Sequence, residues 1–303
     1  MAITAQDVKA LREMTGVGMM DCKKALAASD GDMDKAVEWL REKGLAASAK
    51  KAGRIAAEGM AYAGVIDGVG VVVEVNAETD FVGKNEKFVD FVKGVAATVA
   101  ACAPADLDAL MECKYNGTDL TVTQQQQEMV LVIGENIKVR RFARFADGVS
   151  VPYIHAGGKI GVLVNLEVTG GIDATEVGKD LAMQIAALNP RFLDKGQVTQ
   201  EVLDEEKKIL LAQMANDPKM ASKPDKVKEN IVAGKLNKFY AENCLLQQAF
   251  VKDGDITVEQ YVDAAAKKLG GTIVLKDAVR FEKGEGIEKK QENFAEEIAK
   301  LAK

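Results

Sequence analysis

The chain has 303 residues, of which 48% are hydrophobic and 28% are charged, and its 40 basic and 46 acidic side chains give a formal net charge of −6. This composition is typical of a soluble globular protein, and the length predicts two or three folding units. The negative charge disfavours direct nucleic-acid binding and attraction to anionic membranes, and no apolar run is long enough to cross a bilayer.

The four cysteines, Cys22, Cys102, Cys113 and Cys244, are scattered along the chain and lack the short spacings of a zinc site or a disulfide framework. We therefore expect four reduced thiols and no metal site. The first residues carry no apolar signal core, so we expect a cytoplasmic protein. His155 is the single histidine, which excludes any mechanism or metal site that needs two and weakens the case for an enzyme.

Three short helices are predicted for residues 1–53, the expected N-terminal domain. Thr4 and Asp7 have the spacing of a capping box at the start of the first helix. Apolar residues then recur at helical spacing up to Gly44, where we expect the third helix to end. The next segment, "LAASAKKAGRIAAEG", predicts a helical or flexible connector, and its basic side chains form a solvated surface more simply than a docking site.

Strand patterns begin in the next expected unit, residues 54–148. The segment "YAGVIDGVGVVVEV" predicts a β-hairpin, because Asp67 and Gly68 form a strong turn signal between two apolar runs. A related segment, "YIHAGGKIGVLVNL", follows later, and both segments place a glycine (Gly70 and Gly161) eight residues after a tyrosine. A helical pattern follows each segment, so the sequence indicates two related α+β subdomains.

Two charged helical patterns in residues 198–242 predict an antiparallel helical hairpin, inserted between two parts of the second subdomain, 149–197 and 243–283. Its narrow apolar stripes are compatible with self-association, as a homodimer or a two-to-two complex, and equally with an extended contact surface. Residues 284–303 predict a C-terminal helical module. The expected fold class is therefore α+β, with an N-terminal three-helix bundle, two core subdomains, the hairpin and a C-terminal helix.

Catalytic motifs are absent from the sequence. "GVGMMDCKK" resembles a phosphate loop but lacks its order of residues, and "GVIDGVG" lies inside the predicted hairpin without the glycine order of a dinucleotide site. The nucleophile, metalloprotease and kinase signatures are missing as well. We therefore expect neither catalytic residues nor a cofactor.

Large apolar side chains stand at two predicted turns instead of on packed faces. Met19 and Met20 follow two glycines at a helix start, where a position capping the core and an exposed position fit the pattern equally well. Phe81 follows Asp80 where the hairpin ends, and from the pattern alone its ring more simply folds back into the core.

Five segments resemble, in the same order along the chain, the bacterial translation elongation factor Ts family: "LREMTGVGMMDCKKAL", "EVNAETDFVGKN", "IGENIKVRR", "HAGGKIGVLV" and "RFEKGEGIEK". The resemblance covers nearly the whole chain. This sequence departs from a common family pattern at Ala77, Glu78 and Gly83, where Cys, Gln and Ala are frequent, and keeps the adjoining "TDFV".

The resemblance implies guanine nucleotide exchange, without covalent chemistry, on elongation factor Tu, the GTPase that delivers aminoacyl-tRNA to the ribosome. It implies an N-terminal bundle similar to a ubiquitin-associated domain, and a C-terminal helix, residues 287–302, that docks on the GTPase. It also implies that Phe81 inserts as a wedge near the magnesium site of the GTPase, with Asp80 making polar contacts beside it. Further positions that the resemblance places against the GTPase are Thr79, Val82, Met19, Met20, Lys23, Ile133, Gly134, His155 and Val251.

Two other functional classes remain open at this point. A pure binding module would use the N-terminal bundle to recognise some other protein and would have no exchange activity. A metabolic α+β enzyme would require a pocket with convergent titratable groups, for which the sequence offers no candidates. The sequence also leaves open the stoichiometry of any complex and the structure of residues 103–122.

Overall fold

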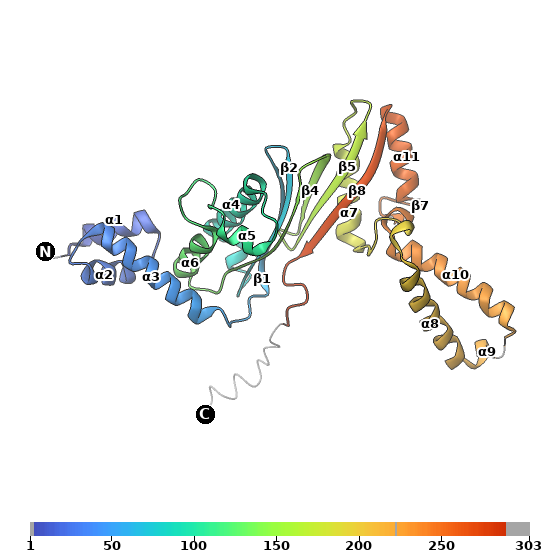
Figure 1. Ribbon diagram of the computed structural model, residues 1–303, viewed down its shortest axis with the longest axis horizontal. Helices are drawn as coiled ribbons and strands as arrows, with labels where there is room; N and C mark the ends of the chain where they lie inside the picture. Colours follow the sequence, from blue (N-terminus) through green and yellow to red (C-terminus); the bar gives the residue numbers. More distant parts are fainter. Residues whose placement is uncertain (1–2, 222, 289–303) are drawn as a thin grey trace.

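The computed structural model describes residues 3–221 and 223–288, which form an elongated molecule (Figure 1). Three N-terminal helices lie at one end, two β-sheets with their helices occupy the middle, and a helical hairpin projects at the other end. The predicted C-terminal helix lies outside the described residues from position 289 onward. In the two described ranges, no helix combines the length and the apolar composition needed to cross a membrane.

The N-terminal bundle has the predicted three helices. They are α1 (Ala5–Thr15), α2 (Met19–Ala28) and α3 (Met33–Lys51). The capping box at the start of α1 is confirmed, because the Thr4 backbone N–H donates to the Asp7 carboxylate at 2.9 Å and the Asp7 N–H donates to the Thr4 hydroxyl at 3.2 Å. The bundle buries an apolar centre that includes Leu11, Leu26 and Leu40.

The prediction that the third helix ends at Gly44 was wrong, because α3 continues to Lys51. Gly44 is buried where α3 packs against α6 (Val122–Ile133). A side chain at this position would place its Cβ atom 3.3 Å from the backbone carbonyl oxygen of Gln127. The glycine therefore permits close packing of the bundle on the core.

The first core subdomain contains a three-stranded antiparallel sheet in the order β1-β2-β3. Its elements are β1 (Glu58–Ile66), β2 (Val69–Ala77), η1 (Val82–Lys84), α4 (Glu86–Cys102), α5 (Leu107–Glu112), α6 and β3 (Lys138–Phe145). The predicted hairpin turn is confirmed, because Asp67 and Gly68 have φ values of 50° and 81°, as a two-residue turn of type I′ requires. Residues 103–122 contain α5 and an antiparallel bridge between Lys114 and Thr121.

The second core subdomain contains a three-stranded antiparallel sheet in the order β4-β5-β8. Its elements are β4 (Val149–His155), β5 (Ile160–Thr169), α7 (Thr175–Leu188), η2 (Lys195–Gln197), η3 (Leu245–Gln247), β6 (Ala249–Phe250), β7 (Asp253–Thr257), α11 (Val258–Leu269) and β8 (Thr272–Glu282). The inserted hairpin consists of α8 (Gln200–Asn216), α9 (Pro218–Ala221) and α10 (Asp225–Asn243). Its two long helices pack through Leu210, Met214 and Val232.

The two core subdomains share one topology, as the repeated sequence pattern predicted. Each has a β-hairpin, then a helix, and later a strand that pairs with the second strand of the hairpin. Each also has a register shift in that last pairing, after Glu74 in β2 and after Asn165 in β5. These two residues lie at the same distance along the chain from the matched glycines, Gly70 and Gly161, which strengthens the interpretation as a duplication.

The two sheets pack against each other through a buried apolar cluster. Ala61, Val72 and Leu163 are buried in the cluster between them. A Cβ atom at Gly161 would lie 3.1 Å from the backbone carbonyl group of Ala61, and one at Gly70 would collide with Ser150. The glycines that revealed the repeat are therefore positions at which the two sheets lie close together.

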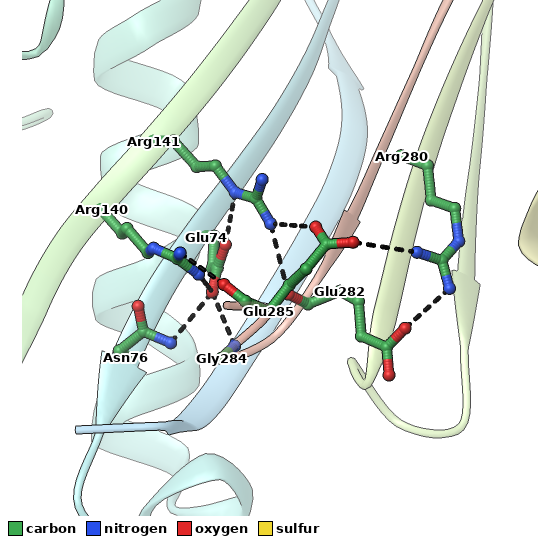
Figure 2. A network of polar contacts seen from close by, with 8 residues as sticks. All are labelled: Glu74, Asn76, Arg140, Arg141, Arg280, Glu282, Gly284 and Glu285. Carbon is green, nitrogen blue, oxygen red and sulfur yellow. Dashed lines mark hydrogen bonds and ion pairs between the residues drawn. The ribbon is translucent and has the colours of Figure 1, made fainter. Parts of the chain in front are cut away.

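A buried carboxylate, that of Glu74, fastens the two subdomains together (Figure 2). Glu74 lies on β2 and accepts hydrogen bonds from Arg140 at 2.9 Å and from Arg141 at 2.5 Å, both on β3. It also accepts one from the backbone N–H of Gly284, just beyond β8, at 2.8 Å. Arg141 continues the network to the Glu285 carboxylate at 2.9 Å. The end of β8 is thereby bound to the first sheet.

Cys102 and Cys113 form a disulfide bond, so the prediction of four reduced thiols was wrong for this pair. Cys102 ends α4 and Cys113 follows α5, and the chain between them folds back until their Cα atoms are 6.6 Å apart. A separation of 11 residues does not reveal such a return. Cys22 and Cys244 are free and buried.

Candidate functional site

Phe81 stands out from the surface of the first core subdomain, in the turn between β2 and α4. Its side chain is 80% exposed, the highest value among the exposed large hydrophobic residues of the described chain. The interpretation that the ring folds back into the core was therefore wrong. Val82 takes the core position instead and is only 7% exposed. The turn therefore buries the Val82 side chain and leaves the Phe81 ring exposed to solvent.

The turn before Phe81 is held by the carboxylate of Glu135. One carboxylate oxygen accepts hydrogen bonds from the backbone N–H groups of Glu78 and Thr79, both at 3.0 Å. The other oxygen accepts from the Thr79 hydroxyl at 2.7 Å. After Phe81, the N–H of Asn85 donates to the Val82 carbonyl group at 2.9 Å and begins α4. Polar contacts thus fix the chain before the ring, and core packing fixes it afterwards.

The contact between the two loops is reciprocal. The Glu78 carboxylate accepts a hydrogen bond from the backbone N–H of Asn136 at 2.6 Å and lies 3.5 Å from the Arg54 guanidinium group. The Asn136 side chain donates to the backbone carbonyl of Arg54 at 2.8 Å. We call the assembly of Arg54, Glu78, Thr79, Glu135 and Asn136 the clasp. It joins the connector, the Phe81 turn and the loop after α6.

Ile133 and Gly134 adjoin this clasp. Ile133 is the last residue of α6, and Gly134 ends the helix with a φ of 88°, its N–H donating to the Val130 carbonyl group. Glu135 follows at once, so the end of α6, where two of the expected contact residues lie, leads directly into the residue that anchors the Phe81 turn. The structure thus brings residues 79–82 together with 133–134, which are far apart in the sequence.

Met19 and Met20 begin α2 and are 55% and 64% exposed. They are not part of the buried centre of the bundle, for which α2 supplies Cys22, Ala25 and Leu26, and Lys23 is likewise exposed. The loop before α2 lies near the Phe81 turn, because the Lys87 ammonium group on α4 donates to the Gly16 carbonyl at 3.4 Å.

Asp80 is exposed beside Phe81 and lies 3.9 Å from the Lys84 ammonium group, a weak and solvated ion pair. His155 ends β4 and contacts the Tyr153 hydroxyl group at 3.1 Å. Val251 is 46% exposed in the turn after β6, where its backbone N–H donates to the buried side chain of Gln184 at 2.8 Å. His155 and Val251 belong to the second subdomain, and no hydrogen bond among the described residues links them to the Phe81 turn.

Among the described residues, no group of three or more His, Cys, Asp or Glu side chains is placed so that it could hold a metal ion. A groove of about 280 Å³ lies where the N-terminal bundle meets α6, and it is lined mainly by apolar residues such as Met14, Val37 and Leu131. Its charged groups, Arg41 and Glu128, pair with each other at 3.3 Å. The groove therefore resembles a packing defect between two units more than a site for chemistry.

The sequence did not predict the contacts of the clasp. Thr79 was expected only as a contact of the GTPase, and no pattern in the sequence assigned a role to Glu135 or Asn136. The available signal was a pair of polar residues directly after the glycine that ends α6, where the backbone changes direction. Which loop such residues would bind depends on the tertiary structure.

Comparison with known proteins identifies the family. Residues 78–285 match the family model described as "Elongation factor TS". Proteins named elongation factor Ts from Syntrophotalea carbinolica, Magnetococcus marinus and Trichlorobacter lovleyi are 48%, 48% and 50% identical to this chain. These alignments cover 100%, 99% and 100% of this chain, and 100%, 99% and 99% of the respective relatives. The chain therefore belongs to the elongation factor Ts family.

Proposed function

We propose that this protein accelerates the release of GDP from elongation factor Tu in the cytoplasm, without covalent chemistry. Membership of the elongation factor Ts family supports this proposal. The observation that carries it is the Phe81 side chain, an aromatic ring that is 80% exposed on a turn fixed at both ends. Exposed aromatic rings on rigid supports are typical of the residues that dominate protein interfaces.

The proposed mechanism is a shift between two states of the GTPase. GDP is held by a phosphate-binding loop and by Mg²⁺, and a partner that binds better when these ligands are displaced favours release. In our proposal Phe81 enters the GTPase near the magnesium site, with Thr79, Asp80 and Val82 beside it. By linkage, the nucleotide weakens the binding of the exchange factor by the same factor, so both must be able to leave.

The free energy that one buried ring can contribute is too small for Phe81 to act alone. Burying one phenylalanine side chain contributes about 1.5–3 kcal/mol, which corresponds to roughly one or two powers of ten in affinity. We therefore propose that Met19, Met20 and Lys23 on the bundle and Ile133 and Gly134 beside the clasp contact the same domain of the GTPase. His155 and Val251 are proposed to face its other contacts.

Release of fluorescent GDP from purified elongation factor Tu, with and without this protein, tests the function. We expect release to accelerate with the concentration of the protein and to saturate. Stable binding with an unchanged release rate would instead indicate a pure binding module, and no interaction at all would contradict the proposal.

Asp80→Ala is expected to slow release less than Phe81→Ala does, by about two- to fivefold, because Asp80 is exposed and its single ion pair is weak. Asp80→Asn keeps the shape of the side chain and isolates the role of its charge. Stopped-flow release assays at saturating variant give the rate. A native rate for Asp80→Ala would remove Asp80 from the mechanism.

Removing residues 287–303 is expected to weaken binding of the GTPase by about tenfold or more, because Phe294, Ile298 and Leu301 recur at helical spacing in the sequence and are proposed to dock on the GTPase. The folded core should survive, since Glu74 fastens the chain at Gly284, before the deletion. Calorimetric titration measures the affinity, and thermal unfolding monitors the core. Undiminished affinity would refute the docking role.

The helical hairpin is proposed to serve either self-association or an extended contact surface. Ile209, Leu211 and Val227 are exposed large hydrophobic residues on its two long helices, and both roles use such residues. Sedimentation of the protein mixed with its GTPase distinguishes a one-to-one from a two-to-two complex.

A further inference from the structure

We propose that Glu135 is a positioning residue of the exchange reaction, which holds the Phe81 turn so that the ring faces outward. The inference rests on the proposed function and concerns a residue that does not itself need to touch the GTPase. Its basis is geometric: one carboxylate accepts three hydrogen bonds from two consecutive residues, Glu78 and Thr79, just before Asp80 and Phe81.

The three bonds define the direction of the turn. Two successive backbone N–H groups point at one carboxylate oxygen, which fixes the peptide planes on either side of the Glu78 Cα atom. The Thr79 hydroxyl binds the second oxygen, which prevents the carboxylate from rotating. Hydrogen bonds to a charged acceptor are stronger than neutral ones, so the Glu135 carboxylate holds the turn through three strong contacts.

The other side of Phe81 is already fixed by the buried Val82 side chain and by the start of α4. The clasp therefore removes the remaining freedom of the segment. Without the clasp, packing of the exposed phenylalanine ring on nearby apolar surface would lower the free energy, because it takes the ring out of water. Only the fraction of molecules with the ring held outward would then be competent, and the effective activity falls by that fraction.

The second carboxylate of the clasp allows a matched comparison. One oxygen of Glu78 accepts hydrogen bonds from the Asn136 N–H at 2.6 Å and from the Arg54 guanidinium group at 3.5 Å. Glutamine keeps one acceptor oxygen, so Glu78→Gln can retain both of these bonds. Glu135→Gln likewise keeps one oxygen for the two backbone N–H groups, and its NH₂ group can donate to the Thr79 hydroxyl, so this variant loses the charge but can keep the contacts. Glutamine is thus expected to be mild at both positions, whereas Glu135→Ala removes both acceptor oxygens and with them all three contacts.

The experiment compares GDP release at saturating protein for the native chain, Glu135→Ala, Phe81→Ala and the double variant. We expect Glu135→Ala to lower the maximal rate about tenfold, because only about one tenth of the molecules would then hold the ring outward. The double variant should be no slower than Phe81→Ala, because a residue that acts only by positioning the ring has no effect once the ring is gone. Amide hydrogen exchange of residues 79–82 should become faster in Glu135→Ala while the melting temperature changes little.

Thr79→Val removes the hydroxyl contact with Glu135, and we expect a loss of about two- to threefold. Because Thr79 is also proposed to lie against the GTPase, this loss supports positioning only if it disappears in the Glu135→Ala background. Glu38→Ala, at an exposed carboxylate on α3, controls for the loss of a negative charge. Independent losses that multiply in the double variant, or a native maximal rate for Glu135→Ala, would overturn the positioning role. Failure of the native protein itself to accelerate release would instead refute the proposed function, and the two results are distinguishable.

Discussion

Phe81→Ala is expected to slow GDP release from elongation factor Tu by about 10- to 100-fold, the equivalent of the 1.5–3 kcal/mol that burial of this ring contributes. The variant should fold normally. The Phe81 side chain is 80% exposed in the free protein, so its removal leaves no cavity and no unpaired polar group. A large loss of activity with an unchanged melting temperature is the signature of a contact residue.

Stopped-flow release of fluorescent GDP at saturating variant measures the effect, and thermal unfolding checks the fold. Val274→Ala is a suitable control, because Val274 is 51% exposed on β8 and lies in the other core subdomain. Its release rate should equal that of the native protein. Equal rates for Phe81→Ala and the native protein would exclude the ring from the mechanism.

Glu74→Ala is expected to lower the free energy of unfolding by about 3–5 kcal/mol, because removing one partner of a buried ion pair leaves the other charges uncompensated. The side chain of Glu74 is fully buried, and the variant removes this acceptor from Arg140, Arg141 and the Gly284 N–H, although Arg141 keeps its ion pair with Glu285. Partial exposure of the two arginines allows water to reach them, which favours the lower end of this range. Urea unfolding at neutral pH measures the loss.

The contribution of Glu74 should also depend on pH. Burial alone would raise the pKa of its carboxyl group, but hydrogen bonds from Gly284, Asn76 and the two arginines outweigh burial and hold the pKa below its ordinary value of 4.5. A group whose pKa is lowered by folding stabilises the protein above the pKa of the unfolded chain, and this contribution is lost as the pH falls through the folded pKa.

We therefore expect the difference in unfolding free energy between the native protein and Glu74→Gln to be largest near neutral pH. It should shrink as the pH falls below 4.5, because the carboxyl group of the unfolded chain takes up its proton first, and it should vanish once the native carboxyl group is protonated. Urea unfolding of both proteins across this range gives the comparison. A difference that stays constant would show that the charge of Glu74 does not stabilise the fold.

The sequence predicted the repeated architecture because turns and helices depend on residues that are close together in the chain. The Asp67–Gly68 turn fixes its hairpin by backbone conformation alone, and the apolar stripe of α4 follows from helical spacing. Gly70 and Gly161 indicated the duplication, although their physical role, close approach of two sheets, required the tertiary structure.

The errors arose where distant segments meet. Gly44 looked like a helix end, yet it serves packing against α6, and the disulfide between Cys102 and Cys113 depends on a return of the chain that spacing does not reveal. Phe81 is exposed because Val82 occupies the core position, and the two residues are equally apolar in the pattern. Only the resemblance to a family indicated that Phe81 has a role at the surface, since the apolar pattern favoured a buried ring.

The magnesium dependence of the Phe81→Ala defect tests the proposed wedge most directly. Rates of GDP release with saturating native protein and with saturating Phe81→Ala should be compared in excess Mg²⁺ and again in excess chelator. If the ring acts by displacing the magnesium ligands, removing the ion performs the same step, and the ratio of the two rates should fall from about 10 or more toward one. A ratio that is the same with and without Mg²⁺ would contradict this account.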